Sequence, residues 1–338
     1  MSTHAVTNQV PPLSGHSLLT SDPALEEGLR RWSGTTAYED IAVLGELAGR
    51  PEAQRAGDQA NTYTPVLRTH APTGERLDEV EFHPAWHQLM DVAVSHGLTA
   101  SPWTEPVGTG AHVRRAVGFI IWSQVEAGHL CPVSMTYAAV PALRANPDLA
   151  AAWVPKLASR EYDFGLRPLA GKRGAIAGMG MTEKQGGSDV RANTTVATVA
   201  DGGPLAGGET YRLTGHKWFL SAPMSDAFLV LAQTGAGPTC FLVPRVLDDG
   251  SPTPSRCNGS RTSWATAPTP PPRSSSTTPG ACASATRAVA CARSSTWSPR
   301  RGSTACSARP PPCARPSPGP FTTPGTAPPS APASSTSP

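Results

Sequence analysis

The first 170 residues carry apolar side chains at intervals of three and four, the spacing that places them on one face of an α-helix. The pattern is clear in "DPALEEGLRRW", "AYEDIAVLGELAGR", "FHPAWHQLMDVAVSHGL", "GAHVRRAVGFIIWSQVEAGH" and "DLAAAWVPKLAS". The first stretch begins with Asp22 as a candidate N-cap and has Pro23 at the first helical position. Residues 23–174 are therefore predicted to form an α-helical domain, and the polar, turn-rich residues 1–22 an arm that drapes over something larger.

The pattern changes after Gly174 to short runs that are rich in β-branched and aromatic residues. These runs are "TTVATVA", "TYRLTGHKWFLSA", "DAFLVLAQTG" and "TCFLVPRVL", separated by Gly, Pro, Asn and Asp. Such runs predict consecutive strands that form their own antiparallel sheet or barrel over residues 175–255. A helical domain followed by strands gives an α+β fold class. The predicted strands stop near residue 250.

Residues 256–338 differ in composition from the rest of the chain. They contain no Asp, Glu, Lys, Leu, Ile, Met, Tyr, Gln or His, and consist mainly of Pro, Ser, Thr, Ala, Gly and nine Arg. So few large apolar residues predict a disordered tail. With nine of the 28 basic residues in the tail, 19 remain against all 25 acidic ones, so residues 1–255 carry a formal charge of −6. The functional interpretations of the tail are a proline-rich linker or an Arg-rich nucleic-acid arm.

A shifted reading frame explains the tail better than either interpretation. The stretch "RCNGSRTSW" begins at Arg256. Its degenerate codons, read from the third base of each, permit Leu-Gln-Arg-Leu-Ala-Asp-Glu-Leu and then Gly, a charged, amphipathic pattern typical of a folded protein. Our hypothesis is that a single frameshift lies just before Arg256 and that residues 256–338 are out-of-frame translation.

Cysteine spacing and hydropathy predict neither a metal site nor a membrane segment. Two cysteines, Cys131 and Cys240, precede the tail and five lie in it, with no C-x-x-C pair and no following His that would complete a zinc site. The N-terminus lacks the pattern of a signal peptide, and no run approaches the ~18 apolar residues of a membrane span. The sequence predicts a soluble, cytoplasmic protein.

Two motifs carry the candidate chemistry. In "GMGMTEKQGGSDVRANTT", glycines permit close approach of the backbone to a ligand, and Thr182 and Ser188 add hydroxyl donors suited to a phosphate or a heteroaromatic ring. The four glycines are Gly178, Gly180, Gly186 and Gly187. The flanks lack the βαβ context of a dinucleotide fingerprint, and a glycine-rich turn is the alternative. In "LTGHKWFLSAP", Trp218 and Phe219 on an apparent strand offer an aromatic face, unless one ring belongs to the core.

Together and in this order, the two motifs resemble the acyl-CoA dehydrogenase flavoproteins. The stretch "GMGMTEKQGGSDV", with "RLDEVEFHPAWHQLM" and "QVEAGHLCPVSMTYAA" upstream, is similar to sequences of the AidB branch of that family. Members of this branch are adaptive-response proteins linked to DNA alkylation. The resemblance runs from about residue 8 to residue 250. The shifted reading of residues 256–264 is also similar to what that branch carries next, and that of residues 290–307 to the first C-terminal helix of the family.

The resemblance implies a fold and a cofactor. The family has a helical N-terminal domain, a middle β-barrel domain and a C-terminal four-helix bundle, with FAD between barrel and bundle. Thr182 is implied to lie against the isoalloxazine and Ser188 nearer the pyrophosphate, while Phe219 stands where the family commonly has Trp. The implied FAD-binding residues are Met179, Gly180, Met181, Thr182, Gly187, Ser188, Phe219, Leu220 and Ser221.

The resemblance also implies an activity that this chain should lack. FAD accepts hydride from the β-carbon of an acyl-CoA after a carboxylate in the bundle removes the α-proton. No Asp or Glu follows Asp249, so the base, the bundle, the intersubunit FAD contacts of the homo-oligomeric family and the basic DNA surface of the branch are absent. Glu183 and Asp189 are expected to hold their loop. We expect an impaired dehydrogenase with an unpaired sheet edge.

Two alternatives remain at this point. One is a flavin-containing protein that binds DNA and protects it against alkylation damage, with DNA as a partner of a full-length form only. The other is a non-functional fragment.

Overall fold

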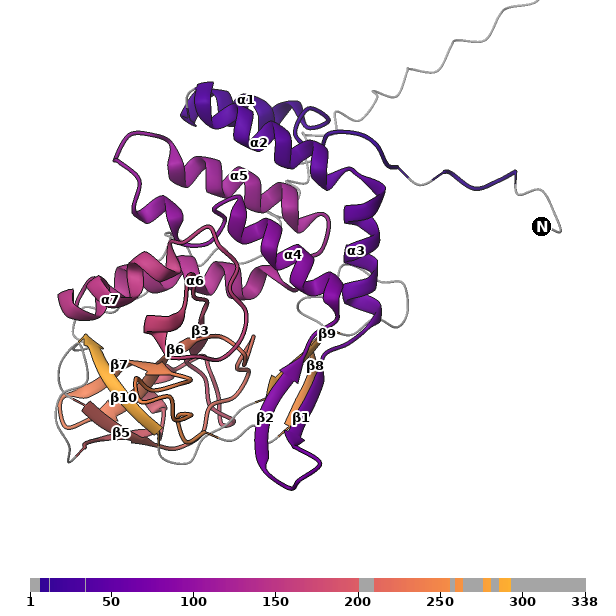
Figure 1. Ribbon diagram of the computed structural model, residues 1–338. Helices are drawn as coiled ribbons and strands as arrows, with labels where there is room; N and C mark the ends of the chain where they lie inside the picture. The colour runs from indigo at the N-terminus through magenta and orange to yellow at the C-terminus, as the bar shows by residue number, and fades with distance from the viewer. Residues whose placement is uncertain are drawn as a thin grey trace, which may run out of the picture. The chain divides into compact units, whose positions relative to one another are not determined.

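The structure is a computed structural model that describes residues 7–11, 13–33, 35–200, 210–255, 259–263, 276–280 and 286–292 (Figure 1). The chain divides into two compact units, Met1–Ala305 and Cys306–Pro338, and the second lies wholly outside the described residues. The first unit joins a helical part to a β-barrel. The prediction of an α+β fold is therefore confirmed.

In the described residues, the helical part consists of seven α-helices and a hairpin. The helices are α1 Pro23–Ser33, α2 Thr35–Ala48, α3 Pro51–Thr62, α4 Pro84–Ser95, α5 Ala111–Ser123, α6 Leu130–Leu143 and α7 Pro147–Leu157, with the 3₁₀ turn η1 Ser101–Trp103. The hairpin pairs β1 Val66–His70 with β2 Arg76–Glu81. The five stretches with helical spacing all form helices, whereas that list did not include α3, α6 or the hairpin.

Local chemistry starts the first helix as the sequence predicts. The Leu25 amide donates a hydrogen bond to Asp22 Oδ1 at 3.0 Å, so Asp22 caps the free amides of α1. Upstream, the Leu18 amide donates to the Gly45 carbonyl at 3.0 Å, and Leu19 is completely buried. A Cβ at Gly49 would lie 1.6 Å from the His16 carbonyl oxygen, so only glycine allows this stretch to pack against the end of α2.

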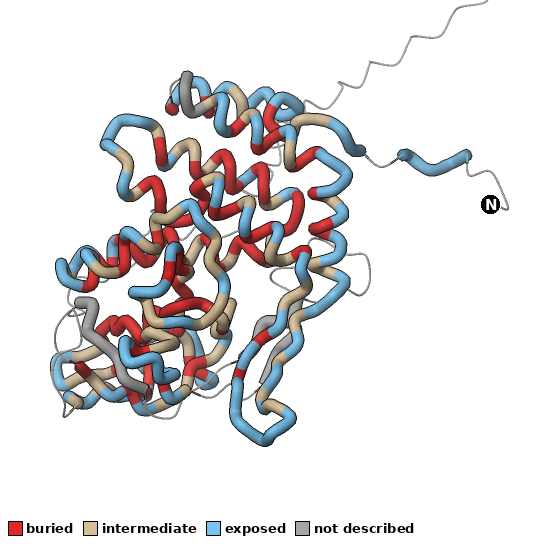
Figure 2. The backbone as a smooth tube through the Cα atoms, in the orientation of Figure 1, coloured by how far each residue is buried: buried red, intermediate tan, exposed pale blue. Residues whose placement is uncertain are grey.

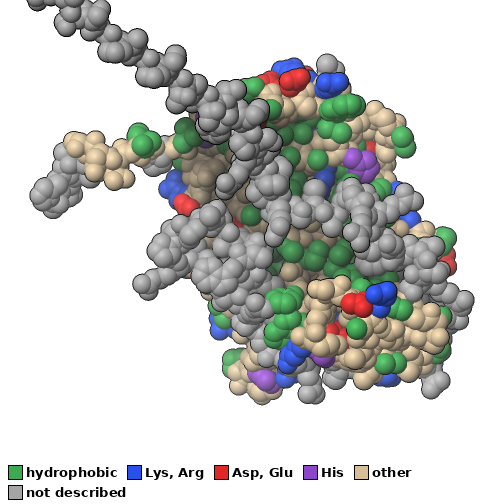
Figure 3. All heavy atoms as spheres, turned by 180° about the vertical axis from the view of Figure 1, so that it is seen from behind, with side chains coloured by type: hydrophobic (Ala, Val, Ile, Leu, Met, Phe, Trp, Pro, Cys, Tyr) green, Lys and Arg blue, Asp and Glu red, His purple; other side chains and the backbone are tan. Residues whose placement is uncertain are grey.

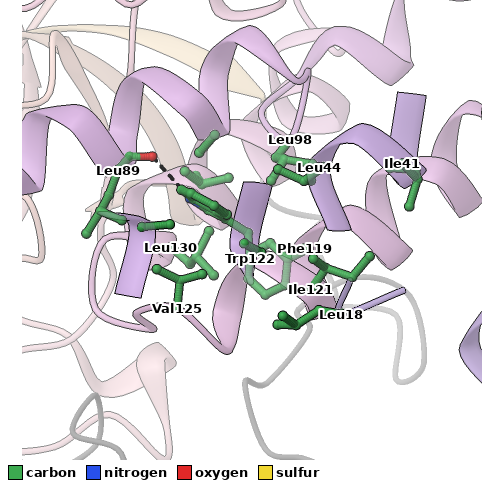
Figure 4. Packing of buried hydrophobic residues seen from close by; sticks show 14 of the residues in the cluster. Leu18, Ile41, Leu44, Leu89, Leu98, Phe119, Ile121, Trp122, Val125 and Leu130 are labelled. Carbon is green, nitrogen blue, oxygen red and sulfur yellow. Dashed lines mark hydrogen bonds between the residues drawn. The ribbon is translucent and has the colours of Figure 1, made fainter. Parts of the chain in front are cut away.

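Apolar side chains from facing helices form the helical core. Buried residues follow the inner faces of the helices, and exposed ones the outer faces (Figure 2). This one-sided burial is what the three-and-four spacing predicts. Trp122 of α5 is 1% exposed, and its Nε1–H donates to the Leu89 carbonyl of α4 at 3.1 Å, so the large ring is buried without losing its hydrogen bond (Figure 4).

The strands after residue 174 form a closed sheet. They are β3 Ala177–Gly180, β4 Val196–Val199, β5 Thr210–Thr214, β6 Ala227–Thr234, β7 Gly237–Pro244 and β10 Thr286–Ala292, with η2 Leu169–Gly171 before them and η3 Val190–Ala192 after β3. Their order is β3-β6-β4-β5-β10-β7, and β6 also pairs with β7, which closes the ring. The sheet is not purely antiparallel, because β3 and β4 both pair with β6 in parallel.

Alternation along β6 separates the inside of the barrel from its outer face. Phe228 and Val230 belong to the inner cluster with Phe241, whereas Leu229 and Leu231 pack against the cluster that includes α6 and α7. A second contact fixes β3 to α6, because the Ala177 amide donates to Thr136 Oγ1 at 3.0 Å. The helical part and the barrel therefore share a core.

The expected end of the strands near residue 250 needs correction. Three later segments are strands: β8 Gly259–Ser263, β9 Ser276–Gly280 and β10. The expected unpaired edge is wrong for β5 and β7, because β10 pairs antiparallel with both. The free amides and carbonyls on the edges of β5 and β7 can pair with any extended backbone. The composition of the tail therefore does not predict whether a tail segment forms a strand there. The rest of the tail, for which we predict disorder, lies outside the described residues.

Candidate functional site

Two loops at one end of the barrel bring the predicted motifs together. The first loop follows β3 and the second joins β5 to β6. Thr182 Oγ1 donates to the Trp218 carbonyl at 2.5 Å, and the Trp218 amide donates back to the Thr182 carbonyl at 3.0 Å. Two residues further along, the Lys184 amide donates to His216 Nε2 at 3.1 Å. Residues 36 and 32 apart in sequence thus form one surface.

Glu183 lies at the centre of this junction and is fully hydrogen-bonded. Its carboxylate accepts from the amides and hydroxyls of Thr194 and Thr195, from Gln185 Nε2 and from Lys217 Nζ. Burial raises the pKa of the Glu183 carboxyl, but the hydrogen bonds, led by that from Thr195, outweigh burial and hold this pKa well below its ordinary value. The prediction that Glu183 holds its loop rather than performing acid–base work agrees with this geometry.

The second motif is not a strand where its aromatic residues lie. β5 ends at Thr214, and Phe219 and Ala222 adopt left-handed backbone conformations with φ of 60° and 49°. Such conformations are uncommon for residues with a side chain and store strain. The prediction of a strand through Trp218 and Phe219 is therefore wrong. The strained turn leaves Phe219 46% exposed, with its ring centroid 5.8 Å from that of Trp218.

At two positions of the first motif, glycine is needed because a neighbouring side chain of the protein leaves no room for a Cβ. A Cβ at Gly178 would lie 2.3 Å from the Phe228 ring, and a Cβ at Gly187 would lie 2.6 Å from Thr182 Cγ2. At both positions the close neighbour is a side chain of this chain. The glycines therefore pack β3 onto β6 and the loop onto Thr182, a use that the motif alone did not reveal.

The remaining predicted site residues divide by exposure. Gly187 and Ser188 are exposed at the tip of the first loop, Gly180 is buried, and the others are partly buried: Met179, Met181, Thr182, Leu220 and Ser221. Leu220 also lines a cavity of about 60 Å³ inside the barrel. The structure thus brings the two groups of predicted residues into one junction, with hydroxyls and an aromatic ring on its accessible side.

Cys131, at the start of α6, is a site residue that the sequence did not single out. Its side chain hydrogen-bonds Ser221, and burial raises the pKa of the Cys131 thiol. The contact joins the helical part to the second loop. It could not be predicted from spacing, because the two residues lie far apart in sequence and neither has a motif that names the other.

A buried ion pair holds the far end of the second loop. Lys172 Nζ lies 3.0 Å from Asp226 Oδ1 and donates to the carbonyls of Asp163 and Gly165. Asp226 Oδ2 accepts from the Ile176 amide at 2.8 Å. Burial raises the pKa of the Asp226 carboxyl, with Lys172 opposing that effect. The second loop is therefore fixed to Thr182 at its middle and to Lys172 at its end.

Comparison with known proteins gives the family. Residues 8–164 match the family model of the adaptive response protein AidB N-terminal domain, and residues 178–262 match that of the acyl-CoA dehydrogenase middle domain. Over 249 residues the chain is 46% identical to "Putative acyl-CoA dehydrogenase AidB" of Escherichia coli (strain K12), an alignment that covers 73% of this chain and 45% of that protein.

The chain belongs to the acyl-CoA dehydrogenase family, in its AidB-like branch.

Solved structures agree with this assignment at the level of the fold. The AidB-like chain is similar to the structure described as "Bd2924 apo-form", with a TM-score of 0.72 and 26% identity over 85% of this chain and 55% of that one. It also shares its fold with Caenorhabditis elegans ACDH-11 in complex with C11-CoA, with a TM-score of 0.67 and 24% identity over 85% of this chain and 49% of that one. The chain spans less than half the length of the curated relatives that it matches.

The accessible side of the AidB-like junction fits a planar heteroaromatic group. Phe219 is 46% exposed and carries an aromatic ring, and the Thr182 hydroxyl, whose proton goes to the Trp218 carbonyl, offers acceptor lone pairs. Ser188 and the amides around Gly187 lie at the exposed loop tip, where they can donate to an anion. Within the described residues there is no cluster of three His, Cys, Asp or Glu that could hold a metal ion. In the same residues we find no helix long and apolar enough to span a membrane.

Proposed function

We propose that residues 8–255 form the flavin-binding part of an AidB-like acyl-CoA dehydrogenase and that its cofactor is FAD. The observation that carries this proposal is the reciprocal pair of hydrogen bonds between Thr182 and Trp218. These bonds hold the two motifs together and support the strained turn that exposes Phe219. Residues of both motifs are thereby available to one flat ligand.

The residues divide the binding of FAD among them. Phe219 and Thr182 would hold the isoalloxazine, and Ser188 with Gly187 the pyrophosphate. The neighbouring Met179 and Met181 pack against the shared core, so they supply apolar surface at the base of the site. When bound, FAD supplies the acceptor for hydride from the acyl β-carbon, and the protein supplies orientation and exclusion of water.

The substrate class follows from the family and stays a proposal for this chain. The related worm protein binds an acyl-CoA, C11-CoA, and we propose an acyl-CoA for a chain that contains the C-terminal domain. None of the three carboxylates near the junction, Glu183, Asp189 and Asp226, is free to act as the missing base. Asp189 is paired with Arg191. Glu183 is saturated with hydrogen-bond donors, and Asp226 is paired with Lys172. We therefore propose that the 338-residue chain binds flavin without turning over acyl-CoA.

A flavin-binding experiment tests the proposal directly. The purified full chain is titrated into FAD, and quenching of flavin fluorescence gives the dissociation constant. Thr182→Ala is expected to weaken binding about tenfold, because it removes a hydroxyl that orders the junction. Thr198→Ala, at an exposed hydroxyl on β4, serves as the matched control and should bind as the parent does. A parent chain that does not bind FAD would refute the proposal.

The tail belongs to a second part of the same proposal. We infer that residues 256–338 arise from a shifted reading frame, because they contain no acidic residue and because their shifted codons permit segments similar to the family. The middle-domain match ends at residue 262, close to the inferred shift. Resequencing across codons 245–262 tests the inference: a missing or extra base supports it, and an uninterrupted frame refutes it.

DNA binding is proposed only for a chain that contains the C-terminal domain. Residues 1–255 carry a formal charge of −6, which repels the DNA backbone. Basic and acidic side chains are interspersed on the described part of the face in Figure 3, and hydrophobic ones lie between them. Assembly into a homo-oligomer likewise stays a prediction from the family. Salt-sensitive duplex binding by an in-frame chain, with negligible acyl-CoA turnover, would favour the DNA-protective alternative over a dehydrogenase.

A further inference from the structure

The junction of the two motifs has three cross-links, and its middle one is a buried ion pair. Thr182 bonds Trp218 on one side and Lys184 bonds His216 on the other. Between them, Lys217 Nζ lies 3.0 Å from Glu183 Oε1, with the two side chains 5% and 0% exposed. The residues of the outer cross-links are partly or largely exposed, whereas the ion pair is buried and Lys217 lines the barrel cavity.

The ion pair of Glu183 and Lys217 is held by several additional hydrogen bonds, which distinguishes it from an ordinary surface salt bridge. Besides Lys217, donors from Gln185, Thr194 and Thr195 occupy the Glu183 oxygens. These donors come from both sides of the first loop, so one carboxylate fixes the start and end of that loop and the second loop as well. Charge-assisted hydrogen bonds of this kind are short and directional. A shift of either loop must break several of them at once.

We propose that Glu183 and Lys217 are positioning residues for the flavin: their buried contact sets where Thr182 and Phe219 stand relative to each other, and FAD affinity depends on it. The inference rests on the proposed flavin site and adds two residues that do not touch the cofactor. Phe219 is two residues from Lys217, and Thr182 is adjacent to Glu183, so displacement of the pair moves both groups that face the ring.

Three variants of the full chain separate positioning from general stability. Glu183→Gln removes the carboxylate charge, Lys217→Met leaves the carboxylate buried without its cation, and Lys217→Arg keeps a cation. The matched control is Glu161→Gln, which makes the same change at the exposed pair of Glu161 and Arg173, 2.9 Å apart. For each variant, FAD affinity is measured by fluorescence quenching, the flavin absorption spectrum is recorded, and cofactor-free stability is measured by urea unfolding.

The expected result is a loss of affinity in the folded protein. Glu183→Gln and Lys217→Met should weaken FAD binding about tenfold or more, since each disrupts hydrogen bonds to a charged group. They should also shift the flavin spectrum, because the ring then meets a less ordered surface. Lys217→Arg should restore most of the affinity, and Glu161→Gln should bind as the parent does.

Other outcomes overturn the inference. If folded Glu183→Gln and Lys217→Met bind FAD as tightly as the parent, with an unchanged spectrum and only a lower urea midpoint, the pair is merely structural. If either single variant fails to fold, the charge-free double variant Glu183→Gln/Lys217→Met carries the test, and parental affinity in it overturns the inference. If the parent itself does not bind FAD, the proposed function fails together with this inference, a result distinct from a parent that binds and variants that match it.

Discussion

At Gly187, adding a single methyl group would disturb the candidate site. A Cβ there would lie 2.6 Å from Thr182 Cγ2, closer than non-bonded atoms approach. The Thr182 side chain could avoid the clash only by rotating, but its rotamer is fixed by the hydrogen bond from Oγ1 to the Trp218 carbonyl. The residue is therefore small because the loop packs on Thr182.

Gly187→Ala is expected to weaken FAD binding about tenfold, because the rotation breaks a hydrogen bond that orders the junction. Fluorescence titration with FAD measures this change in affinity. Gly171→Ala is the control, since a Cβ there would meet no atom within 4 Å. Equal affinity in both variants would show that the loop adapts to the added methyl group.

The acid side of the stability profile should report Glu183. Its folded pKa lies below the ordinary value of 4.5, so the ionised carboxylate stabilises the fold above pH 4.5, and that contribution is lost as pH falls below this value. Glu183→Gln lacks this contribution at every pH. We expect the difference in free energy of unfolding between parent and Glu183→Gln to be largest near pH 7 and to shrink as pH falls below 4.5.

Urea unfolding followed by circular dichroism at about pH 7, 5 and 3.5 measures this difference, since these values lie on both sides of the ordinary carboxyl pKa. Asp226, whose pKa is raised, contributes with the opposite sign, but it is present in both proteins and cancels in the comparison. A difference that is constant across this range would contradict the assignment of an ionised Glu183.

The sequence predicts individual residues only where a motif carries them. The motif residues around Thr182 and Ser188 were recognisable by resemblance, whereas Lys217 and Cys131 act through partners 34 and 90 residues away. The left-handed backbone at Phe219 could not be predicted either, because it depends on the packing of both loops. Pairing between distant residues is a property of the fold and has no local signal.

Among the elements, α6 and β3 form the link between the helical part and the barrel. Thr136 is completely buried; its Oγ1 accepts from the Ala177 amide at 3.0 Å and donates to the Pro132 carbonyl at 2.8 Å. The hydroxyl thus satisfies a strand amide from within a helix.

Thr136→Val is expected to lower the free energy of unfolding by about 1–3 kcal/mol, because it leaves the buried Ala177 amide without an acceptor. Urea unfolding measures the change. Thr198→Val, on the exposed side of β4, should change stability by no more than about 0.5 kcal/mol. If the two variants are equally stable, the contact between α6 and β3 contributes nothing to the fold.

Elements were predictable where burial is one-sided. Helices α1, α2, α4, α5 and α7 bury one face, so their apolar spacing shows in the sequence. Helix α3 buries only small residues, Ala53, Ala56 and Gly57, and so leaves no such pattern. The hairpin β1–β2 interrupts the helical part with few buried residues of its own.

At the scale of the whole molecule, closure of the barrel depends on β10. It pairs with β5 from Thr286 to Val289 and with β7 from Val289 to Ala292. Composition placed this segment in a region without expected structure, whereas sheet closure is decided by the two strand edges that face it.

Truncation after Ser255 should therefore destabilise the chain. We expect a lower thermal midpoint and aggregation that increases with protein concentration, because the edges of β5 and β7 become free to pair with other chains. Truncation after Ala292, which keeps β10, is the control. Thermal unfolding and light scattering compare the two, and identical behaviour would show that β10 does not support the barrel.

The pairing of β10 has a consequence for the frameshift that we infer before Arg256. Its described pairings join main-chain atoms, and main-chain atoms are the same whatever the codons specify. Closure of the barrel by main-chain pairing therefore depends little on which side chains the last strand carries. Selection on folding alone would therefore not remove a frameshift of the kind we infer, whereas selection on catalysis would.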